Sequence, residues 1–185
     1  MTTLITGATG LVGGHIARAL HRRGERLWIL VRPRSSREGL VGVDAEEVLG
    51  DVRDPASLRR AMEGVERVVH AAALTRLDPF AAERMRSINV EGTRNVLEAA
   101  RAAGVKRLLH VSSIAAVGSG TLDRPADETT AWNFEHKGPY WATKHEAEQL
   151  VLDAARRGDL DAVIIHKLED YGIEIGRASC RERVY

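Results

Sequence analysis

Apolar and polar positions along this chain alternate between two patterns. Short runs of leucine and β-branched residues are each followed by a stretch whose apolar residues recur with helical spacing. The runs are typical of buried strands and the stretches of amphipathic helices, and their regular alternation is typical of βαβ units. The predicted fold class is α/β, a doubly wound parallel sheet with helices on both faces. We predict strands at residues 4–5, 27–31, 43–49, 65–70, 105–111 and 162–166, and helices at residues 11–23, 55–63, 81–103 and 139–157.

Composition narrows the class of protein. The chain has 185 residues, 44% of them apolar, and its 27 basic and 26 acidic side chains leave a net charge of +1. This balance argues against disorder and against nucleic acid as a partner. No apolar run is long enough to span a membrane, and no signal segment precedes the first strand, so we expect a cytoplasmic protein. The single cysteine, Cys180, excludes an internal disulfide.

A glycine-rich turn follows the first predicted strand and opens the first predicted helix. Residues 6–13 read TGATGLVG, with the spacing G-x-x-G-x-x-G. Gly7 permits a tight turn, Gly10 lets the backbone approach a pyrophosphate, and Gly13 allows the helix to pack closely on the strand. The amino end of the helix offers unpaired N–H groups to the phosphates. We therefore predict a dinucleotide site that also includes Thr9, Leu11 and Val12.

Three further motifs follow in order. Asp51 and Val52 come after the third strand, Ala71, Ala72 and Ala73 after the fourth, and residues 89–93 (NVEGT) lie in the long helix. With the glycine turn, they resemble the extended, epimerase/dehydratase-like branch of the short-chain dehydrogenase/reductase superfamily over about residues 2–166. The resemblance implies a Rossmann fold. It also implies that Asp51 and Val52 lie against the adenine, that the three alanines line the cofactor, and that Asn89 supports the site.

The end of the second strand indicates which nicotinamide cofactor binds. An acidic residue there would hold the ribose 2′-hydroxyl of NAD. None occurs between Leu27 and Arg37, and Arg32 sits at the strand end instead, followed by Arg34, two serines and Arg37. A guanidinium can grip a 2′-phosphate with two parallel hydrogen bonds. We predict NADP(H) rather than NAD(H), with Arg32 as the principal contact; Arg34 and Arg37 fit a solvated loop equally well.

The catalytic candidates are a serine, a tyrosine and a lysine. Tyr140 and Lys144 are spaced i, i+4 and so share one face of a helix. The ammonium would favour the phenolate form, so that Tyr140 could act as general acid or base and Lys144 could also hold the nicotinamide ribose. Ser112 and Ser113 end the fifth strand, and both could hydrogen-bond the reacting oxygen. The family alignment favours Ser113.

Other residues carry less chemistry. His70 and His110 lie at strand ends, but no Cys, His and carboxylate spacing suggests a metal site, so we interpret them as packing or hydrogen-bonding residues. Trp132 and Trp141 fit a substrate pocket or the core equally well. The connections at residues 32–40 and 118–138 are long enough to be functional, although a solvated surface is the alternative. The resemblance implies that the long helix and the Tyr140 helix form a homodimer interface.

The end of the chain departs from the family. Family members continue after the sixth strand with Arg-Pro or a similar turn, and then build a smaller lobe for substrate contacts; here His166 and Lys167 follow. Residues 174–184 (EIGRASCRERV) resemble the translation of a DNA-sequencing library adapter. We expect a Rossmann domain at residues 1–166, an unassigned tail at 167–185 whose residues 174–185 are foreign, and a missing C-terminal lobe. A genuine short protein with a charged tail is the alternative.

These observations predict an enzyme that transfers hydride between a nicotinamide cofactor and a carbonyl or secondary alcohol of a small molecule. Residues 112–118 (SSIAAVG) resemble dihydroflavonol-reductase-like members most. The first alternative is a nucleotide-sugar epimerase or dehydratase, which removes and returns the hydride within one turnover. A second alternative, from another class, is a non-catalytic NADP(H)-sensing regulator. The sequence does not name the substrate.

Overall fold

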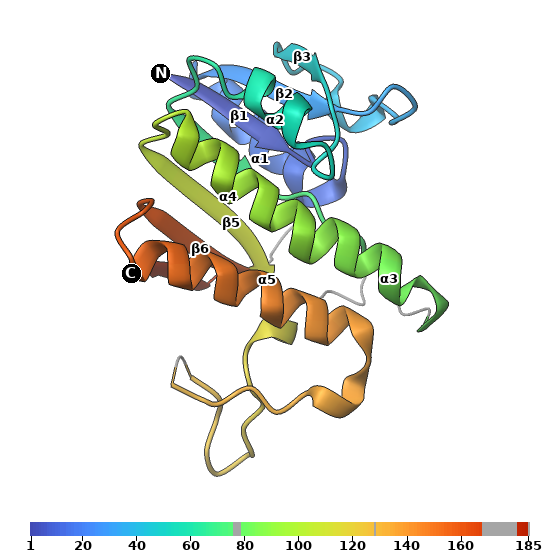
Figure 1. Cartoon of the computed structure of the whole chain (residues 1–185), viewed down its shortest axis with the longest axis vertical. Coiled ribbons are helices and arrows are strands. Elements are labelled where there is room, and N and C mark those ends of the chain that lie inside the picture. Colours follow the sequence, from blue (N-terminus) through green and yellow to red (C-terminus); the bar gives the residue numbers. More distant parts are fainter. Residues whose placement is uncertain (76–78, 128, 168–180, 185) are drawn as a thin grey trace.

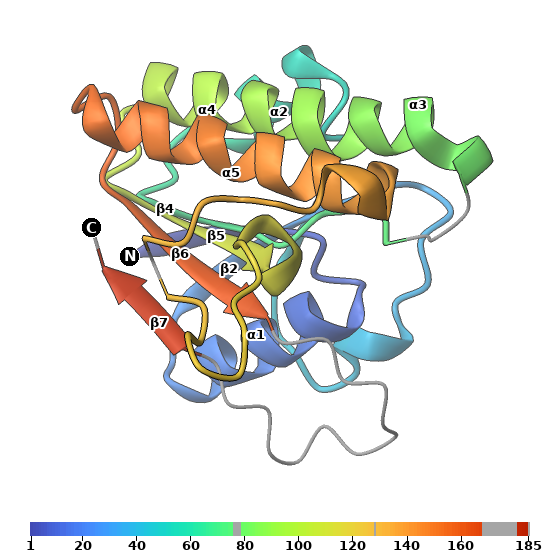
Figure 2. The same ribbon diagram turned by 90° about the horizontal axis from the view of Figure 1, so that it is seen from below.

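The computed structural model of the protein describes residues 1–75, 79–127, 129–167 and 181–184. In this part of the chain, one sheet is covered on one face by α2, α3, α4 and α5 and on the other by α1 (Figures 1 and 2). The strands are β1 (Thr2–Thr6), β2 (Arg26–Val31), β3 (Glu46–Leu49), β4 (Arg67–His70), β5 (Arg107–Ser113), β6 (Ala162–Lys167) and β7 (Arg181–Val184). The helices are α1 (Leu11–Arg22), α2 (Pro55–Ala61), α3 (Ala82–Met85), α4 (Gly92–Ala102) and α5 (Pro139–Arg156).

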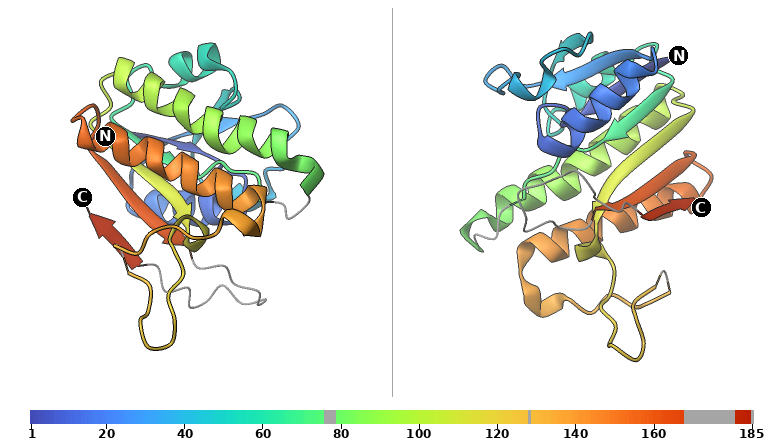
Figure 3. Two further views of the ribbon diagram at one scale, coloured as in Figure 1. Left: turned by 60° about the horizontal axis from the view of Figure 1, so that its bottom comes forward. Right: turned by 180° about the vertical axis from the view of Figure 1, so that it is seen from behind.

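The sheet confirms the predicted doubly wound fold. Its strand order is β3-β2-β1-β4-β5-β6-β7, and the first six strands are parallel. The order reverses between β1 and β4, which is the switch point where such sheets bind ligands at the carboxyl ends of their strands. The right-hand view of Figure 3 shows α1 on the face that α4 and α5 leave uncovered.

Successive strand residues enter two different cores because their side chains alternate across the sheet. Leu4, Leu30 and Leu108 belong to a core under α2, α4 and α5. Ile5 and Ile29 belong to a second core, which Ala17 of α1 completes. This division explains why the strands read as continuous apolar runs.

Several predicted elements differ from the observed ones. The predicted strands at 43–49 and 65–70 shorten to β3 and β4. The predicted single helix at 81–103 is α3 and α4 joined by a π-helical segment, Arg86–Glu91. The predicted tail lies largely outside the described residues, Cys180 included. Within it, Arg181–Val184 forms β7 antiparallel to β6, a strand that the sequence pattern does not predict.

None of the helices in the described part of the chain combines the length and apolarity that crossing a bilayer requires.

Candidate cofactor-binding and catalytic site

The glycine-rich turn between β1 and α1 has the close contacts expected of a phosphate-binding loop. Gly7 has a φ of +75°, and a Cβ there would lie 2.6 Å from the Ala71 carbonyl carbon at the end of β4. A Cβ on Gly13 would lie 2.3 Å from the Gly7 carbonyl oxygen. Only glycine fits either position without moving backbone. Within the described residues, no side chain caps α1 at Gly10, so the N–H groups of its first turn are suited to binding an anion.

Two adjoining cavities extend from this turn along the carboxyl ends of the strands. They share Gly7, Gly10, Ala71 and Ala73. The first, of about 270 Å³, is also lined by predicted site residues Thr9, Arg32, Asp51, Val52 and Ala72. The second, of about 260 Å³, is also lined by predicted site residues Leu11, Val12, Gly13, Tyr140 and Lys144. The structure therefore brings together residues that the sequence places in five separate motifs.

The rim of the first cavity is charged. Two hydrogen bonds from the Arg53 guanidinium hold the Asp51 carboxylate, at 3.0 and 2.7 Å. Arg53 lowers the pKa of Asp51, and the charge of Arg32, which lines the same cavity, lowers it further. Val52 is held by Asn95 of α4, whose side-chain N–H donates to its carbonyl at 3.0 Å.

Tyr140 and Lys144 lie one turn apart near the amino end of α5, and both are buried. The Lys144 ammonium donates to the Val111 carbonyl on β5 at 3.0 Å. Burial lowers the pKa of Lys144 to about 8, with Lys167 adding to the decrease and Glu148 opposing it. Lys144 is therefore an ammonium at neutral pH that lies close to its titration point.

The two serines at the end of β5 have different partners. The Ser112 hydroxyl donates to the buried carboxylate of Glu148, which also pairs with His166 at 2.8 Å. Burial raises the pKa of Glu148, but the contacts with His166 and Ser112 and the charge of Lys144 outweigh it, so the net shift is downward. The Ser113 hydroxyl instead accepts from the Ala115 N–H at 3.2 Å, which leaves its proton for another acceptor.

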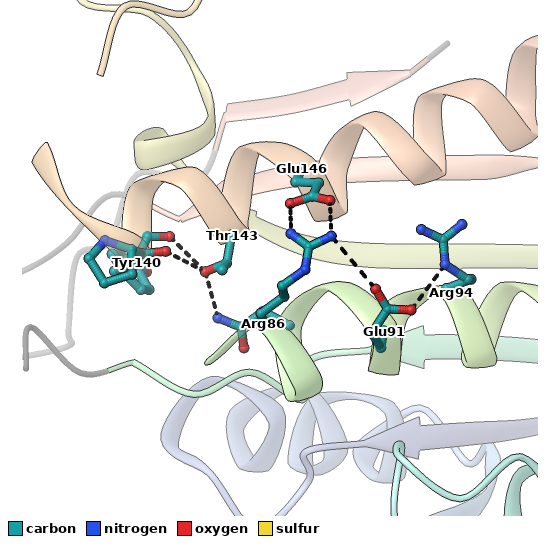
Figure 4. A network of polar contacts seen from close by, with 8 residues as sticks. Arg86, Glu91, Arg94, Tyr140, Thr143 and Glu146 are labelled. Atoms are coloured by element: carbon teal, nitrogen blue, oxygen red, sulfur yellow. Dashed lines mark hydrogen bonds and ion pairs between the residues drawn. The ribbon is translucent and has the colours of Figure 1, made fainter. Parts of the chain in front are cut away.

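Asn89 lies behind the cavities rather than in their lining. Its amide oxygen accepts from the Leu74 N–H at 2.7 Å, and its amide nitrogen donates to the Thr143 hydroxyl at 3.2 Å. The Asn89 side chain thus ties the segment after β4 to the catalytic face of α5. Figure 4 shows Thr143 beside Tyr140, with Arg86 reaching from the π-helical segment to Glu146 of α5, a pairing at 2.7 Å.

The rest of the 89–93 motif also serves the site. A Cβ on Gly92 would lie 2.8 Å from the Val52 side chain, so the small residue lets Val52 reach the cavity. The Thr93 hydroxyl donates to the Asn89 carbonyl at 2.6 Å and contacts His70 Nε2 at 3.0 Å. His70 Nδ1 lies 2.7 Å from the Thr6 hydroxyl. Because Thr93 already donates, His70 must donate through Nε2 and accept at Nδ1, which fixes its neutral tautomer.

The hydrogen bonds of His70 agree with its interpretation as a structural residue. His110 packs against His70 with ring centroids 5.3 Å apart, and neither of its nitrogens has a hydrogen-bond partner in the described part of the chain. No group of metal-ligating side chains is found among the described residues. Trp132, in the connection at 118–138, stacks on His145 and so attaches that connection to α5. Trp141 packs edge-on against Tyr140.

Sequence reasoning missed several residues that line the cavities. Ser35 and Arg84 face the first cavity, and Thr75 and Lys167 face the second. Arg84 carried no usable signal, because Ile88, one helical turn further on, is seen to line the same cavity only in the structure. The others lie in connections or at a strand end, where no periodicity shows which way a side chain faces.

A comparison with known families decides the classification. Residues 3–179 match the sequence model of the family described as "NAD dependent epimerase/dehydratase family". The chain belongs to this family. The result confirms the resemblance that the glycine turn, Asp51 and Val52, the three alanines after β4 and residues 89–93 indicate.

Proteins similar to this chain are named for different substrates. The chain is 40% identical to sterol demethylase protein B of Methylococcus capsulatus, over 90% of this chain and 50% of the relative. It is 36% identical to a putative dihydroflavonol 4-reductase of Synechocystis, over 88% and 47%. The Thermus thermophilus UDP-glucose 4-epimerase, solved in complex with NAD, superposes with a TM-score of 0.77 at 27% identity, over 89% and 54%. The chain thus spans about half the length of the relatives it matches.

Proposed function

We propose that this chain forms the cofactor-binding part of an NADP(H)-dependent oxidoreductase that interconverts a carbonyl and a secondary alcohol. One observation carries the proposal. Tyr140 and Lys144 are buried one helical turn apart on the wall of a cavity that is continuous with the glycine turn. A proton donor and its activating cation therefore lie at one end of a site whose other end suits a dinucleotide.

The residues present fit a nicotinamide dinucleotide. The cradle at Gly7 and Gly13, which any Cβ would fill, brings backbone N–H groups to the place of a pyrophosphate. Asp51, Val52 and the three alanines would hold the adenosine side, and Tyr140 and Lys144 the nicotinamide ribose. When bound, the cofactor supplies or accepts the hydride.

Each catalytic side chain has a separate task in the proposal. Tyr140 gives a proton to the substrate oxygen during reduction and takes it back during oxidation. The Lys144 ammonium favours the Tyr140 phenolate and so lowers the pKa of the phenol. We assign Ser113 to hydrogen-bond the same oxygen, because the Ser112 hydroxyl is engaged by Glu148, although Ser112 rather than Ser113 is among the residues that line the second cavity. Asn89 acts at a distance by fixing Thr143, which lies between Tyr140 and Lys144 on α5.

The proposed preference for NADP(H) over NAD(H) rests on the positive charge of Arg32. Arg32 lies at the cavity rim where NAD-dependent proteins carry an acid, and among the described residues no carboxylate lies within ion-pairing distance of it. Its guanidinium is thus available for a 2′-phosphate. The Thermus relative binds NAD, so the preference of this chain depends on its own residues.

The surroundings of Tyr140 suggest the substrate class. Tyr140 shares a small apolar cluster with the buried side chains of Met85 and Ala115, against which Leu74 and Trp141 pack, and Leu74 also lines the first cavity. Relatives named for sterol and dihydroflavonol chemistry agree with a bulky, largely apolar small molecule. The likeness to the UDP-glucose epimerase supports the second candidate, a nucleotide-sugar epimerase or dehydratase, which would consume no net cofactor. A non-catalytic sensor would have no need for the buried Tyr140–Lys144 pair.

We further propose that two copies pair through α4 and α5, as the resemblance implies. A groove between these helices is lined by Leu97, Leu150 and Ala154, and Arg94 and Arg101 lie at its edge. Burying such a mixed surface in a two-fold interface would cover its apolar floor.

The proposed chemistry is tested by replacing Tyr140 with Phe. We expect NADPH oxidation with a panel of cyclic and aromatic ketones to fall by about a hundredfold or more, because the proton donor is lost. NADPH affinity, measured by titration, should change little. Lys144→Met should lower both turnover and affinity, whereas Lys137→Met, at an exposed lysine before α5, should lower neither. Turnover retained in Tyr140→Phe would refute the assignment.

A further inference from the structure

The turn after β2 is tied to the neighbouring strand by one side chain. The Arg37 guanidinium donates to the backbone carbonyls of Arg32, at 3.1 Å, and of Ser35. It also forms two hydrogen bonds with the Glu47 carboxylate on β3, at 3.1 and 2.9 Å. The Ser35 N–H closes the turn by donating to the Arg32 carbonyl at 3.1 Å. The sequence left open whether Arg37 contacts the phosphate or lies in a solvated loop; in the structure this partly exposed side chain connects the turn to the sheet.

The residues that this turn presents to the cofactor cavity are Arg32 and Ser35. The same two residues also line a shallow hollow with Pro33 and Arg34 on the outer side of the turn. On the far side of the connection, Arg18 of α1 donates to the Gly39 carbonyl. The connection at 32–40 is thus held at both ends, by Arg37 to β3 and by Arg18 of α1.

We propose that Arg37, held by Glu47, is the positioning residue of the 2′-phosphate subsite, and that the Ser35 hydroxyl is the second phosphate contact beside Arg32. The inference rests on the NADP(H) preference proposed above and names the residues that build it. Glu47 neutralises the charge of Arg37, so this pair contributes shape, whereas Arg32 contributes the unpaired charge. A turn tied to β3 by Arg37 has less conformational freedom to lose on binding than an untied loop would have.

The test compares the affinities of NADP⁺ and NAD⁺ by calorimetric titration. Arg37→Ala and Glu47→Ala should each weaken NADP⁺ binding by about tenfold, since each removes the same connection. NAD⁺ binding should stay nearly constant. The double variant should be no weaker than either single variant, because both changes act on one interaction. Arg32→Asp, which removes the phosphate contact itself, should reverse the preference toward NAD⁺.

Matched controls come from the same elements. Glu46 is the neighbour of Glu47 on β3 and pairs with Arg26 at 3.6 Å, at the other end of β2, so Glu46→Ala should leave both affinities unchanged. Ser35→Ala should weaken only NADP⁺ binding. Ser36→Ala should not, since the Ser36 hydroxyl accepts from the Glu38 N–H. Circular dichroism should show every variant folded, because the Arg37–Glu47 pair is largely exposed and stabilises little.

The outcomes separate this inference from the cofactor proposal. If Arg37→Ala weakens NADP⁺ binding but Glu47→Ala strengthens it or leaves it unchanged, Arg37 contacts the phosphate directly and the positioning role is overturned. If Arg32→Asp reverses the preference while Arg37→Ala and Glu47→Ala behave like the parent protein, the cofactor proposal stands and this inference fails. A parent protein without preference for NADP⁺ would overturn both.

Discussion

At the scale of single residues, Lys144 shows how burial prepares a side chain for chemistry. It is almost completely buried, and its ammonium donates a hydrogen bond to the Val111 carbonyl. The charged and titratable groups that interact electrostatically with it come from four elements: Glu148 on α5, His70 on β4, His110 on β5 and Lys167 on β6. Glu148, one turn further along α5, is the group among them that raises the pKa of Lys144.

The pH dependence of cofactor binding and turnover should therefore depend on Glu148. Lys144 is charged below its pKa of about 8 and loses its proton above it, so cofactor affinity and turnover should both fall as pH rises through that value. Glu148→Gln keeps an acceptor for Ser112 but removes the negative charge, which should lower the pKa of Lys144 further and move the fall to lower pH. The measurement is NADPH affinity and kcat/KM across a pH series.

Two variants separate charge from hydrogen bonding. Ser112→Ala keeps the Glu148 charge and should leave the position of the fall unchanged. Glu146→Gln removes a carboxylate from the same helix, but one that pairs with Arg86, and it should behave like the parent protein. Identical pH profiles in Glu148→Gln and the parent would contradict the assigned role.

At the scale of elements, the sequence predicts the glycine turn correctly but does not predict the interruption of the long helix. The turn was predicted together with its neighbours, because glycine spacing reports a close approach of backbones that no other residue allows. The long helix was predicted as continuous, and the π-helical segment Arg86–Glu91 was not foreseen. Such a segment places Asn89 toward Leu74 and Thr143, and that choice depends on contacts from α5 and from the segment after β4.

Gly13→Ala should disrupt the turn. Its Cβ would lie 2.3 Å from the Gly7 carbonyl oxygen, a backbone atom that cannot rotate away. We expect a loss of about 1–3 kcal/mol in the free energy of unfolding by urea, together with weakened cofactor binding. Gly39→Ala is the matched control, because the nearest atom to its Cβ is the Thr9 carbonyl oxygen at an ordinary 3.7 Å. Equal behaviour of the two variants would show that the turn can relax.

At the scale of the whole molecule, a row of polar side chains crosses the sheet beneath α4 and α5. Thr6, His70 and His110 occupy paired positions on β1, β4 and β5. Burial lowers the pKa of His70 to about 3, with the charge of Lys144 adding to the decrease. Burial likewise lowers the pKa of His110, with Lys144 contributing. Both histidines are therefore neutral in the folded protein at pH values where an unfolded chain would protonate them.

The folded protein should accordingly lose stability in acid. Below about pH 6.5 the unfolded state binds protons that the folded state excludes, so the free energy of unfolding should fall as pH falls, by roughly 1 kcal/mol per pH unit for each histidine. Urea unfolding at neutral pH and near pH 5 measures the slope. His110→Leu should reduce it, whereas His15→Leu, at an exposed position on α1, should not. An unchanged slope in His110→Leu would contradict the cause.

Features that depend on residues close together in the sequence could be predicted, and features that depend on contacts between distant segments could not. The six parallel strands, the glycine turn and the i, i+4 pair of Tyr140 and Lys144 could be predicted, because each depends on neighbours within a few residues. β7 could not, because backbone pairing at the open edge of β6 requires no apolar pattern in Arg181–Val184. The role of Arg37 could not be predicted either, because Arg37 lies in the connection after β2 and its partner Glu47 lies ten residues further on, in β3.

The sequence by itself determined the fold class, and it singled out the glycine turn and the Tyr140–Lys144 pair as candidates for phosphate binding and proton transfer, since periodicity, glycine conformation and side-chain chemistry are properties of short segments. Only the tertiary structure decided that Glu148 engages Ser112 rather than Ser113, that Asn89 supports the site from behind, and that Arg37 shapes the turn at Arg32. These are choices among hydrogen-bond partners from different elements. They are made only when the sheet places those elements side by side and burial makes an unsatisfied polar group costly.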